Sequence, residues 1–364
     1  MKRVLCIVGG MNAGGAETFL MKIYRTIDKE YFQMDFATVV PGVYDEEIQT
    51  MGGRVYRITP KTQGPIKNFL DIKNLVKKEN YKSVLRVSQS SLSALELLAA
   101  KCGGAEITAF RSSNSNTTSG DILNGVIHRL FMWMPIAFAN VRIAPSTEAA
   151  EFMYGKKCIK NGKAVLLNNG LDLDVFRYDE DLRKVIRSEL GVEDNIKLLG
   201  HVGRFIKQKN HRFLIEVFSE VHKKDTNTML VLVGQGELED EIKNRVEELG
   251  LTDSVIFTGV RKDVPALLSA MDVFVFPSFY EGMPNTVIEA QATGLPCLIS
   301  DKITKEVKIT DLVKYLDLEK GDEWVEKILS INLEVRKGYE QTFVEKGYDI
   351  QSQVENFTKL LFME

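Results

Sequence analysis

Two cationic side chains stand close together in the segment that follows the first predicted strand of the second half of the chain. Arg204 and Lys209 are five positions apart within residues 203–211, between a strand and a helix. A guanidinium presents a planar fork of N–H donors and an ammonium acts as a compact point charge, so together they suit a phosphate or diphosphate group. A solvated loop would tolerate the same residues, and the pair alone therefore indicates an anion site without establishing one.

Two carboxylates occur in a second segment of the same half, residues 276–290. The chain leaves a predicted strand, carries Glu281 in a turn at Gly282, and enters near Pro284 a helix that also holds Glu289. Proline is tolerated in the first helical turn, where backbone N–H groups lack intrahelical partners and can face a ligand beside the carboxylate. Because 50 of the 364 residues are acidic, carboxylate spacing is weak support, and the strand–turn–helix context makes the segment specific.

Glycine-rich turns follow the first predicted strand of the first half, residues 3–8, and the second predicted strand of the second half, residues 229–233. Gly14 and Gly15 precede a helix, and backbone N–H groups at a helix N-terminus suit a phosphate, although a tight turn alone also favours glycine. The corresponding turn of the second half contains Gly234 and Gly236. Neither turn completes the pattern G-x-G-x-x-G, and no G-x-x-x-x-G-K-[ST] occurs, which disfavours a dehydrogenase and a phosphate-loop ATPase.

Short apolar runs alternate with helical patterns along the chain, as in βαβ units with parallel sheets. Strands are predicted at residues 3–8, 34–40, 54–58, 83–87, 107–110 and 141–144, and again at 197–201, 229–233, 255–257, 273–276 and 297–299. Helices are predicted at residues 16–27, 69–78, 92–100, 121–138, 211–221, 238–249 and 350–362.

This rhythm restarts after a turn at residues 168–170, so the sequence predicts an α/β protein of two doubly wound, Rossmann-like domains. The first spans residues 1–170, the second spans residues 171–345, and a last helix at about 346–364 can pack back on the first domain. Two such domains facing each other would place a cleft between the carboxyl ends of their strands, where open α/β sheets bind ligands.

The composition fits ordinary globular domains, with 44% apolar and 27% charged residues. The four cysteines are too far apart for a C-x-x-C motif, which favours a reducing compartment, and we expect a cytoplasmic protein. No apolar stretch reaches about 18 residues, so no transmembrane helix is predicted.

The net charge of −3 conceals an asymmetry between the two halves. Residues 1–170 hold 22 Lys and Arg against 14 Asp and Glu, a balance of +8, and the remainder holds 25 against 36, a balance of −11. The lysines gather in two clusters, Lys61, Lys67, Lys73, Lys77, Lys78 and Lys82, and Lys156, Lys157, Lys160 and Lys163. The clusters indicate either solvated helix faces or peripheral contact with the anionic inner face of a cell membrane. No nucleic-acid partner is expected, because the basic segments lack interleaved aromatic residues.

One stretch of the second half carries a family pattern. The segment Glu281-Gly-Met-Pro, followed by Glu289-Ala and by Gly294-Leu-Pro, resembles the E-x7-E signature of the retaining family 4 glycosyltransferases, which have the GT-B fold. Arg204 with Lys209 is similar to the Arg/Lys diphosphate clamp of that family. The motif set is specific for the family and only weakly specific for the sugar.

The resemblance extends over nearly the whole chain, in the same order. The segment Gly14-Gly15-Ala16-Glu17 resembles the N-terminal glycine loop of the family, and residues 169–176 resemble its interdomain turn. The pattern as a whole is most similar to bacterial capsule and exopolysaccharide glycosyltransferases.

The resemblance implies a role for each matching position. Arg204 and Lys209 would hold the donor diphosphate and stabilise the leaving nucleotide. Glu281 would bind hydroxyls of the donor sugar, and Glu289 would take the ribose hydroxyls; Arg204, Lys209 and Glu281 are thus the implied catalytic residues. The other implied donor-binding positions are Gly14 and Gly15 at the phosphate, Val260 and Arg261 against the base, and Gly282, Met283, Pro284, Asn285 and Thr286 around the sugar.

The reaction implied by the resemblance is transfer of a hexose or N-acetylhexosamine with retention of configuration. The donor would be a nucleotide-diphosphate sugar, with uridine diphosphate expected, and the acceptor a glycan or lipid-linked sugar in surface polysaccharide biosynthesis. Fixed cationic side chains can stabilise the negative charge that develops on the leaving diphosphate. No metal and no cofactor is therefore expected.

The chain departs from the family on the acceptor side. Many relatives carry a histidine in the loop after the strand predicted at residues 107–110, where this sequence has Arg111, Ser112 and Ser113. We expect one of these three to fill that place, with Arg111 donating to a sugar hydroxyl or a phosphate oxygen unless it pairs with a carboxylate. Arginine cannot act as a base, because its pKa stays above about 12. His128 is expected to pack inside a helix.

Other functions on the same fold stay open at this point. A sugar-nucleotide epimerase or a phosphorylase would share the architecture, and a catalytically silent nucleotide-sugar-binding or scaffold protein would share the donor site. The intact cationic pair and both glutamates argue against silence. A soluble acceptor is the alternative to a lipid-linked one.

Overall fold

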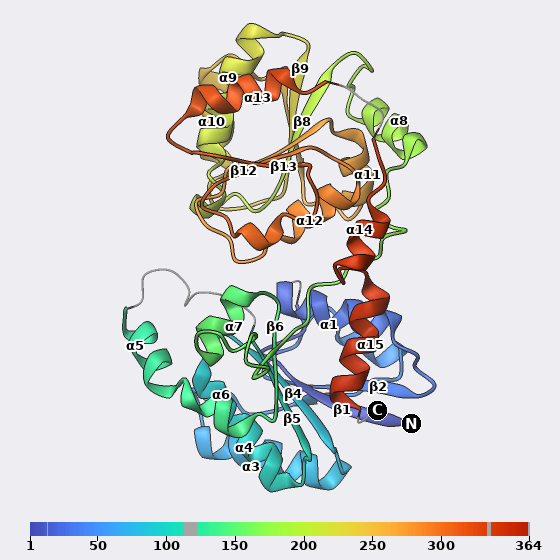
Figure 1. The fold of residues 1–364 in the computed structure, drawn as a ribbon, viewed down its shortest axis with the longest axis vertical. Helices are drawn as coiled ribbons and strands as arrows, with labels where there is room; N and C mark the ends of the chain where they lie inside the picture. The colour runs from blue at the N-terminus through green and yellow to red at the C-terminus, as the bar shows by residue number, and fades with distance from the viewer. Residues whose placement is uncertain (13, 113–121, 333–335, 363–364) are drawn as a thin grey trace. The chain divides into compact units, whose positions relative to one another are not determined.

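The computed structural model describes residues 1–12, 14–112, 122–332 and 336–362, and the chain divides into two compact units (Figure 1). Unit 1 comprises Met1–Gly170 together with Gly347–Glu364, and unit 2 comprises Leu171–Lys346. Each unit contains one parallel sheet with helices packed on it, which confirms the predicted fold class of two doubly wound α/β domains.

The sheet of unit 1 has the strand order β3-β2-β1-β4-β5-β6-β7, and all of its pairings are parallel. Its strands are β1 (Lys2–Ile7), β2 (Phe32–Thr38), β3 (Val55–Arg57), β4 (Ser83–Ser88), β5 (Ile107–Ser112), β6 (Val141–Ala144) and β7 (Val165–Leu166). Its helices are α1 (Gly15–Thr26), α2 (Asp45–Thr50), α3 (Pro65–Glu79), α4 (Leu95–Gly103), α5 (Ile122–Phe131), α6 (Trp133–Phe138), α7 (Thr147–Tyr154) and α15 (Ile350–Leu361), with the 3₁₀ turn η1 (Ser91–Ala94).

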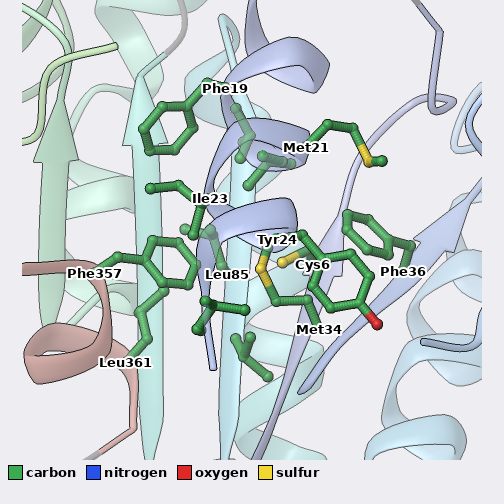
Figure 2. Packing of buried hydrophobic residues seen from close by; sticks show 14 of the residues in the cluster. Cys6, Phe19, Met21, Ile23, Tyr24, Met34, Phe36, Leu85, Phe357 and Leu361 are labelled. Atoms are coloured by element: carbon green, nitrogen blue, oxygen red, sulfur yellow. The ribbon is translucent and has the colours of Figure 1, made fainter. Parts of the chain in front are cut away.

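The two faces of this sheet bury separate hydrophobic clusters, because successive strand residues point to opposite faces. Cys6 packs under α1, whereas its neighbour Ile7 belongs to the cluster on the other face. The chain returns to complete the first cluster, and Figure 2 shows Phe357 and Leu361 of α15 beside the core residues of α1 and β4. Gly170 permits this return, since a Cβ there would come within 3.0 Å of the Ile350 Cα.

Unit 2 repeats the architecture with the strand order β10-β9-β8-β11-β12-β13, again entirely parallel. Its strands are β8 (Lys197–Val202), β9 (Thr228–Val233), β10 (Val255–Gly259), β11 (Val273–Phe276), β12 (Cys297–Ser300) and β13 (Val313–Leu316). Its helices are α8 (Glu180–Glu189), α9 (His211–Lys224), α10 (Glu239–Glu248), α11 (Val264–Ala270), α12 (Asn285–Ala292), α13 (Gly321–Ser330) and α14 (Glu340–Glu345), with the 3₁₀ turns η2 (Lys207–Lys209) and η3 (Lys305–Val307).

Strand order reverses beside the first strand of each sheet. β1 lies between β2 and β4, and β8 lies between β9 and β11. The connections that leave β1 and β8 therefore diverge from those of their neighbours and open a crevice at the carboxyl ends of the strands, the usual ligand position in open α/β sheets. The glycine loop of unit 1 and the segment with Arg204 and Lys209 in unit 2 begin at these two points.

The helix predicted at residues 121–138 is two helices, α5 and α6, that meet at Met132. Pro135 lies in the first turns of α6, and a proline there cannot donate the backbone hydrogen bond that would continue α5. In the parts of the chain that the structure describes, no helix combines the length and the apolar character needed to span a bilayer.

Candidate functional site

The loop between β8 and α9 is shaped by close backbone contacts with the neighbouring turn. The Phe205 N–H donates to Gln235 O at 3.0 Å, and the Leu238 N–H donates to Phe205 O at 3.0 Å. A Cβ on Gly234 would collide with the Gly203 carbonyl, and Gly234 has a φ of +141°, which side chains rarely adopt. A Cβ on Gly236 would likewise meet the Phe205 backbone. These two glycines therefore serve close packing of the loop.

Lys209 and Glu281 form the central contact of the site. The Lys209 ammonium lies 2.7 Å from a Glu281 carboxylate oxygen, and only 15% and 12% of the two side chains are exposed. The same ammonium sits 4.5 Å from the centre of the Phe276 ring, within the range of a cation–π contact. Lys209, in the η2 turn after β8, and Glu281, in the turn after β11, are thus brought together in one partly desolvated place.

Three further hydrogen bonds tie the same two loops. The Gln208 side-chain amide donates to Tyr280 O at 2.8 Å, and the Phe279 N–H donates to Gln208 O at 2.9 Å. The Asn210 amide donates to Pro277 O at 3.2 Å. These bonds involve no charged group, so they hold the loops together independently of the ion pair.

Arg204 stands on the solvent side of this loop. Its side chain is exposed, and no carboxylate of the described residues forms an ion pair with it. The cationic fork therefore remains available to a ligand, five residues before Lys209, whose ammonium is already paired. α12 begins at Asn285 after the Pro284 N-cap, as the sequence predicts, and Glu289 lies half-buried one turn further on.

The loop rests on two buried histidines that sequence reasoning did not assign to the site. His201 is the penultimate residue of β8, is fully buried, and donates from Nδ1 to Val275 O at 2.9 Å. His211 begins α9 and stacks on the Phe205 ring at 4.2 Å. The two imidazoles contact each other edge to face at 4.7 Å. A polar residue near the end of a buried strand is the sequence signal that could have identified His201.

Burial lowers the pKa of both histidines, and the nearby Lys209 ammonium adds to the effect. For His211 the pKa falls from 6.5 to about 4. Between these pH values the folded chain binds fewer protons than the unfolded chain. The contribution of the neutral His211 ring to the free energy of unfolding is therefore complete above pH 6.5 and is lost as the pH falls toward 4. Both rings are neutral at physiological pH.

We expect acidification from pH 7.5 to pH 5 to cost the wild type about 2 kcal/mol of unfolding free energy through His211. His211→Phe keeps a ring on Phe205 and cannot be protonated, so it should lose less over the same interval. Urea unfolding at the two pH values measures the difference. An equal loss in both proteins would show that His211 does not titrate in this way.

Val260 and Arg261, the two positions that the resemblance places against the base, differ in their contacts. Val260 is 68% exposed after β10, which leaves it accessible to a ligand. The Arg261 guanidinium is instead held by Glu189 at 2.6 Å and by Asp263 at 2.6 Å. Contact of Arg261 with a base would thus come from its backbone or would require these ion pairs to open.

The glycine loop of unit 1 ends in an open helix N-terminus. Gly14 is the N-cap of α1, and no side chain caps it through a hydrogen bond. The Glu17 carboxylate lies directly against the place where a Cβ of Gly14 would be. The space beside Gly15 is open, whereas an anion that approached Gly14 would have to displace the Glu17 carboxylate from the N-terminus of α1.

Arg111 lies at the end of β5 with its guanidinium 3.8 Å from the centre of the Phe19 ring. It is 98% buried, donates to Asn169 Oδ1 at 2.8 Å, and pairs with no carboxylate of the described residues. Burial lowers the pKa of Arg111 to about 9, below the value above 12 expected from sequence, and the group still carries its charge at neutral pH.

The other acceptor-side candidates differ in what the structure describes. Ser112 is buried as the last residue of β5, and Ser113 lies outside the described residues. His128 packs within unit 1, as predicted: its ring stacks on Phe152 at 4.1 Å, and its Nε2 lies 3.1 Å from Phe152 O.

Metal-ligating side chains do not gather in threes anywhere in the described parts of the chain. Asp172 and Asp174 have the spacing of an Asp-x-Asp motif, but the Asp172 carboxylate accepts from the backbone N–H groups of Asp174 and Val175, at 3.2 and 3.4 Å, and forms a turn. Metal-independent action stays a prediction.

Comparison with known proteins agrees with this geometry. Residues 183–334 match the family "Glycosyl transferases group 1". EpsF of Bacillus subtilis (strain 168), whose name assigns it to the glycosyltransferases, is 33% identical over 365 residues, covering 97% of this chain and 94% of EpsF. An Escherichia coli UDP-Gal:alpha-D-GlcNAc-diphosphoundecaprenol alpha-1,3-galactosyltransferase is 28% identical, covering 65% of this chain and 62% of that enzyme.

Solved structures share the fold. The crystal structure of Anabaena Alr3699/HepE in complex with UDP superimposes with a TM-score of 0.77 at 16% identity, covering 99% of both chains. WaaG, a glycosyltransferase involved in lipopolysaccharide biosynthesis, gives a TM-score of 0.71 at 16% identity, over 98% of this chain and 99% of WaaG. The architecture is that of the GT-B glycosyltransferases, and with the near-complete match to EpsF the chain belongs to the group 1 glycosyltransferase family.

Proposed function

We propose that this protein is a retaining, metal-independent hexosyltransferase of surface polysaccharide assembly. It would move a hexose or N-acetylhexosamine from a uridine diphosphate sugar to a glycan or lipid-linked sugar. The observation that carries the proposal is the partly buried Lys209–Glu281 pair, in the same loop as the exposed Arg204. Two cations suit a diphosphate, and an adjacent carboxylate suits sugar hydroxyls.

The chemistry follows from the charges at this place. As the bond between the anomeric carbon and the phosphate oxygen breaks, negative charge develops on the diphosphate, and Arg204 and Lys209 stabilise it. The acceptor oxygen bonds to the anomeric carbon on the same face, and the acceptor proton passes to the departing phosphate oxygen. Uridine diphosphate leaves, and configuration is retained. Because Arg204 and Lys209 stabilise the charge on the departing diphosphate, the proposed step needs no metal ion.

The remaining site residues complete the donor pocket. Glu281 would accept hydroxyl protons of the sugar, with backbone N–H groups around Gly282, Met283 and Thr286 beside it. Glu289 would bind the ribose, and Gly14 and Gly15 would bind a phosphate oxygen through the backbone at the N-terminus of α1. The other positions proposed for the pocket are Val260, Arg261, Pro284 and Asn285.

The donor base is tested by binding. Isothermal titration should give tighter binding of uridine diphosphate than of guanosine diphosphate. Support for uridine comes from the UDP named for the E. coli relative and the Anabaena structure. Tighter binding of guanosine diphosphate would overturn the uridine assignment.

We also propose that unit 1 touches an anionic membrane surface and takes a lipid-linked acceptor there. The four lysines of the basic loop, residues 156–163, are exposed, and within the described chain none forms an ion pair. Arg142 ties this loop to α6, because its guanidinium donates to Lys163 O at 3.0 Å and to Ile136 O at 2.8 Å. Trp133 and Ile136 of α6 are 53% and 42% exposed, so apolar and basic groups meet on one surface.

The other lysine cluster, residues 61–82, suits a membrane less well. The Lys61 ammonium donates to Ser93 Oγ at 2.8 Å and lies 3.6 Å from Glu96, and burial lowers its pKa to about 8. Lys82 pairs with Glu106 at 2.7 Å. The ammonium groups of Lys61 and Lys82 are therefore already paired with carboxylates of unit 1.

Vesicle flotation tests the membrane proposal. We expect the protein to float with phosphatidylglycerol vesicles at low salt and to stay behind with phosphatidylcholine, since each basic residue near an anionic surface contributes about 1 kcal/mol. Changing the four loop lysines to glutamine should abolish the difference. The same change at Lys184, Lys223, Lys243 and Lys302 of unit 2, which pair with carboxylates, should not. Equal recovery with both lipids would count against membrane contact.

A further inference from the structure

We infer that the Lys209–Glu281 ion pair is a latch that makes the site distinguish a sugar nucleotide from the bare nucleoside diphosphate. The inference rests on the proposed function, which assigns the diphosphate to Lys209 and the sugar hydroxyls to Glu281. In the structure the two groups that should meet different parts of the donor bind each other at 2.7 Å. A donor must therefore replace this contact, and what replaces it depends on whether a sugar is attached.

The pair can open without disturbing the loops that carry it. The hydrogen bonds from Gln208, Phe279 and Asn210 join the same loops and do not involve either charge. The Phe276 ring stays beneath the ammonium when the carboxylate leaves, so Lys209 keeps one partner during the exchange. Opening the latch is thus a change of side-chain partners on a fixed backbone.

The two ligands differ in whether they give the Glu281 carboxylate a new partner in place of the Lys209 ammonium. A nucleoside diphosphate takes the Lys209 ammonium and leaves a carboxylate that is 88% buried without its cation, and removal of one partner from such a pair is costly. A sugar nucleotide takes the same ammonium and donates sugar hydroxyls to the carboxylate. The latch therefore weakens binding of the product relative to the donor and assists product release after transfer.

The test measures affinity for uridine, guanosine and adenosine diphosphates and for UDP-glucose, in wild type and Glu281→Gln. In Glu281→Gln the diphosphate that binds wild type most tightly should bind five- to tenfold more tightly, whereas UDP-glucose should bind no better. Glu281→Asp keeps the charge but retracts it by one methylene, so it should give a smaller gain. Thermal unfolding of each variant checks that it is folded.

The matched control is Glu220→Gln. Glu220 pairs with Lys223 at 2.6 Å on the exposed surface of α9, so the same charge is removed from the same unit. Its affinities should equal those of the wild type.

The outcomes separate the latch from simple repulsion and from the donor assignment. Simple repulsion between Glu281 and phosphate would raise both affinities equally in Glu281→Gln, and no gain for the diphosphate would mean that the pair does not oppose it; either result overturns the latch. A gain for guanosine or adenosine diphosphate alone would support the latch and refute the uridine donor. If no diphosphate binds wild type but one binds Glu281→Gln, the latch is supported in its strongest form. If none binds either protein, the latch and the proposed function both fail.

Discussion

Arg204→Ala should lower kcat/KM by about 30- to 1,000-fold, a loss of roughly 2–4 kcal/mol of transition-state stabilisation. Arg204 is exposed, and within the described residues no carboxylate neutralises it, so its whole charge is available to the departing diphosphate. Lys209, by contrast, is shared with Glu281. Steady-state rates of nucleoside diphosphate release measure the effect.

Two variants show which property of Arg204 matters. Arg204→Lys keeps the charge but loses the planar fork, so we expect an intermediate loss of about tenfold. Arg245→Ala removes an arginine from the surface of the same unit, where it pairs with Glu216 and Glu248, and should leave the rate unchanged. A full-rate Arg204→Ala enzyme would remove the diphosphate clamp from the mechanism.

Arg111→Ala should reduce activity about 100-fold, whereas His128→Ala should not. A buried guanidinium with no carboxylate partner in the described chain is costly, and its charge lies beside Phe19, in the second turn of α1. We propose that this charge positions a hydroxyl or phosphate oxygen on the acceptor side. The pH–rate profiles of the wild type and both variants are the measurement.

Loss of packing must be separated from loss of charge at Arg111. Arg111→Met retains much of the side-chain length on the Phe19 ring without the charge, and Arg111→Lys retains the charge. We expect the methionine variant to be nearly as inactive as the alanine variant, and the lysine variant to keep part of the activity. If His128→Ala lost activity 100-fold and Arg111→Ala did not, the assignment would be wrong.

Elements with a strong periodic pattern could be predicted from sequence almost to the residue. The strands predicted at residues 141–144 and 273–276 coincide with β6 and β11. For β11 the reason is its continuous apolar run, which is typical of a buried parallel strand. α8 was missed. Its buried contacts include arginines, with Arg183 and Arg187 bound to the buried Asp272 at 2.7 and 3.2 Å. The apolar residues of α8 have helical spacing, but Leu182 and Val185 are exposed and only Ile186 is buried, so their pattern does not show which face packs.

Site residues could be predicted where type and context coincide, and not where a role depends on a spatial neighbour. Contact between the segments of Lys209 and Glu281 follows from two strands that are adjacent in the sheet, β8 and β11. The ion pair between Arg261 and Asp263 is local, whereas the pair with Glu189 depends on α8, so no local pattern shows it. The support that His201 and His211 give the loop has the same character, since each ring packs across the sheet–helix boundary.

Acceptor-dependent release of the nucleotide tests the central claim most directly. The protein is incubated with radiolabelled UDP-glucose, UDP-galactose or UDP-N-acetylglucosamine, with and without a bacterial lipid extract that contains polyprenyl-diphosphate-linked sugars. We predict that one donor releases uridine diphosphate only when the extract is present, that the label moves to the lipid fraction, and that both signals fall at least about 30-fold in Arg204→Ala. Donor binding without release under any of these conditions, or equal release by Arg204→Ala, would contradict the account and favour a binding protein of the same fold.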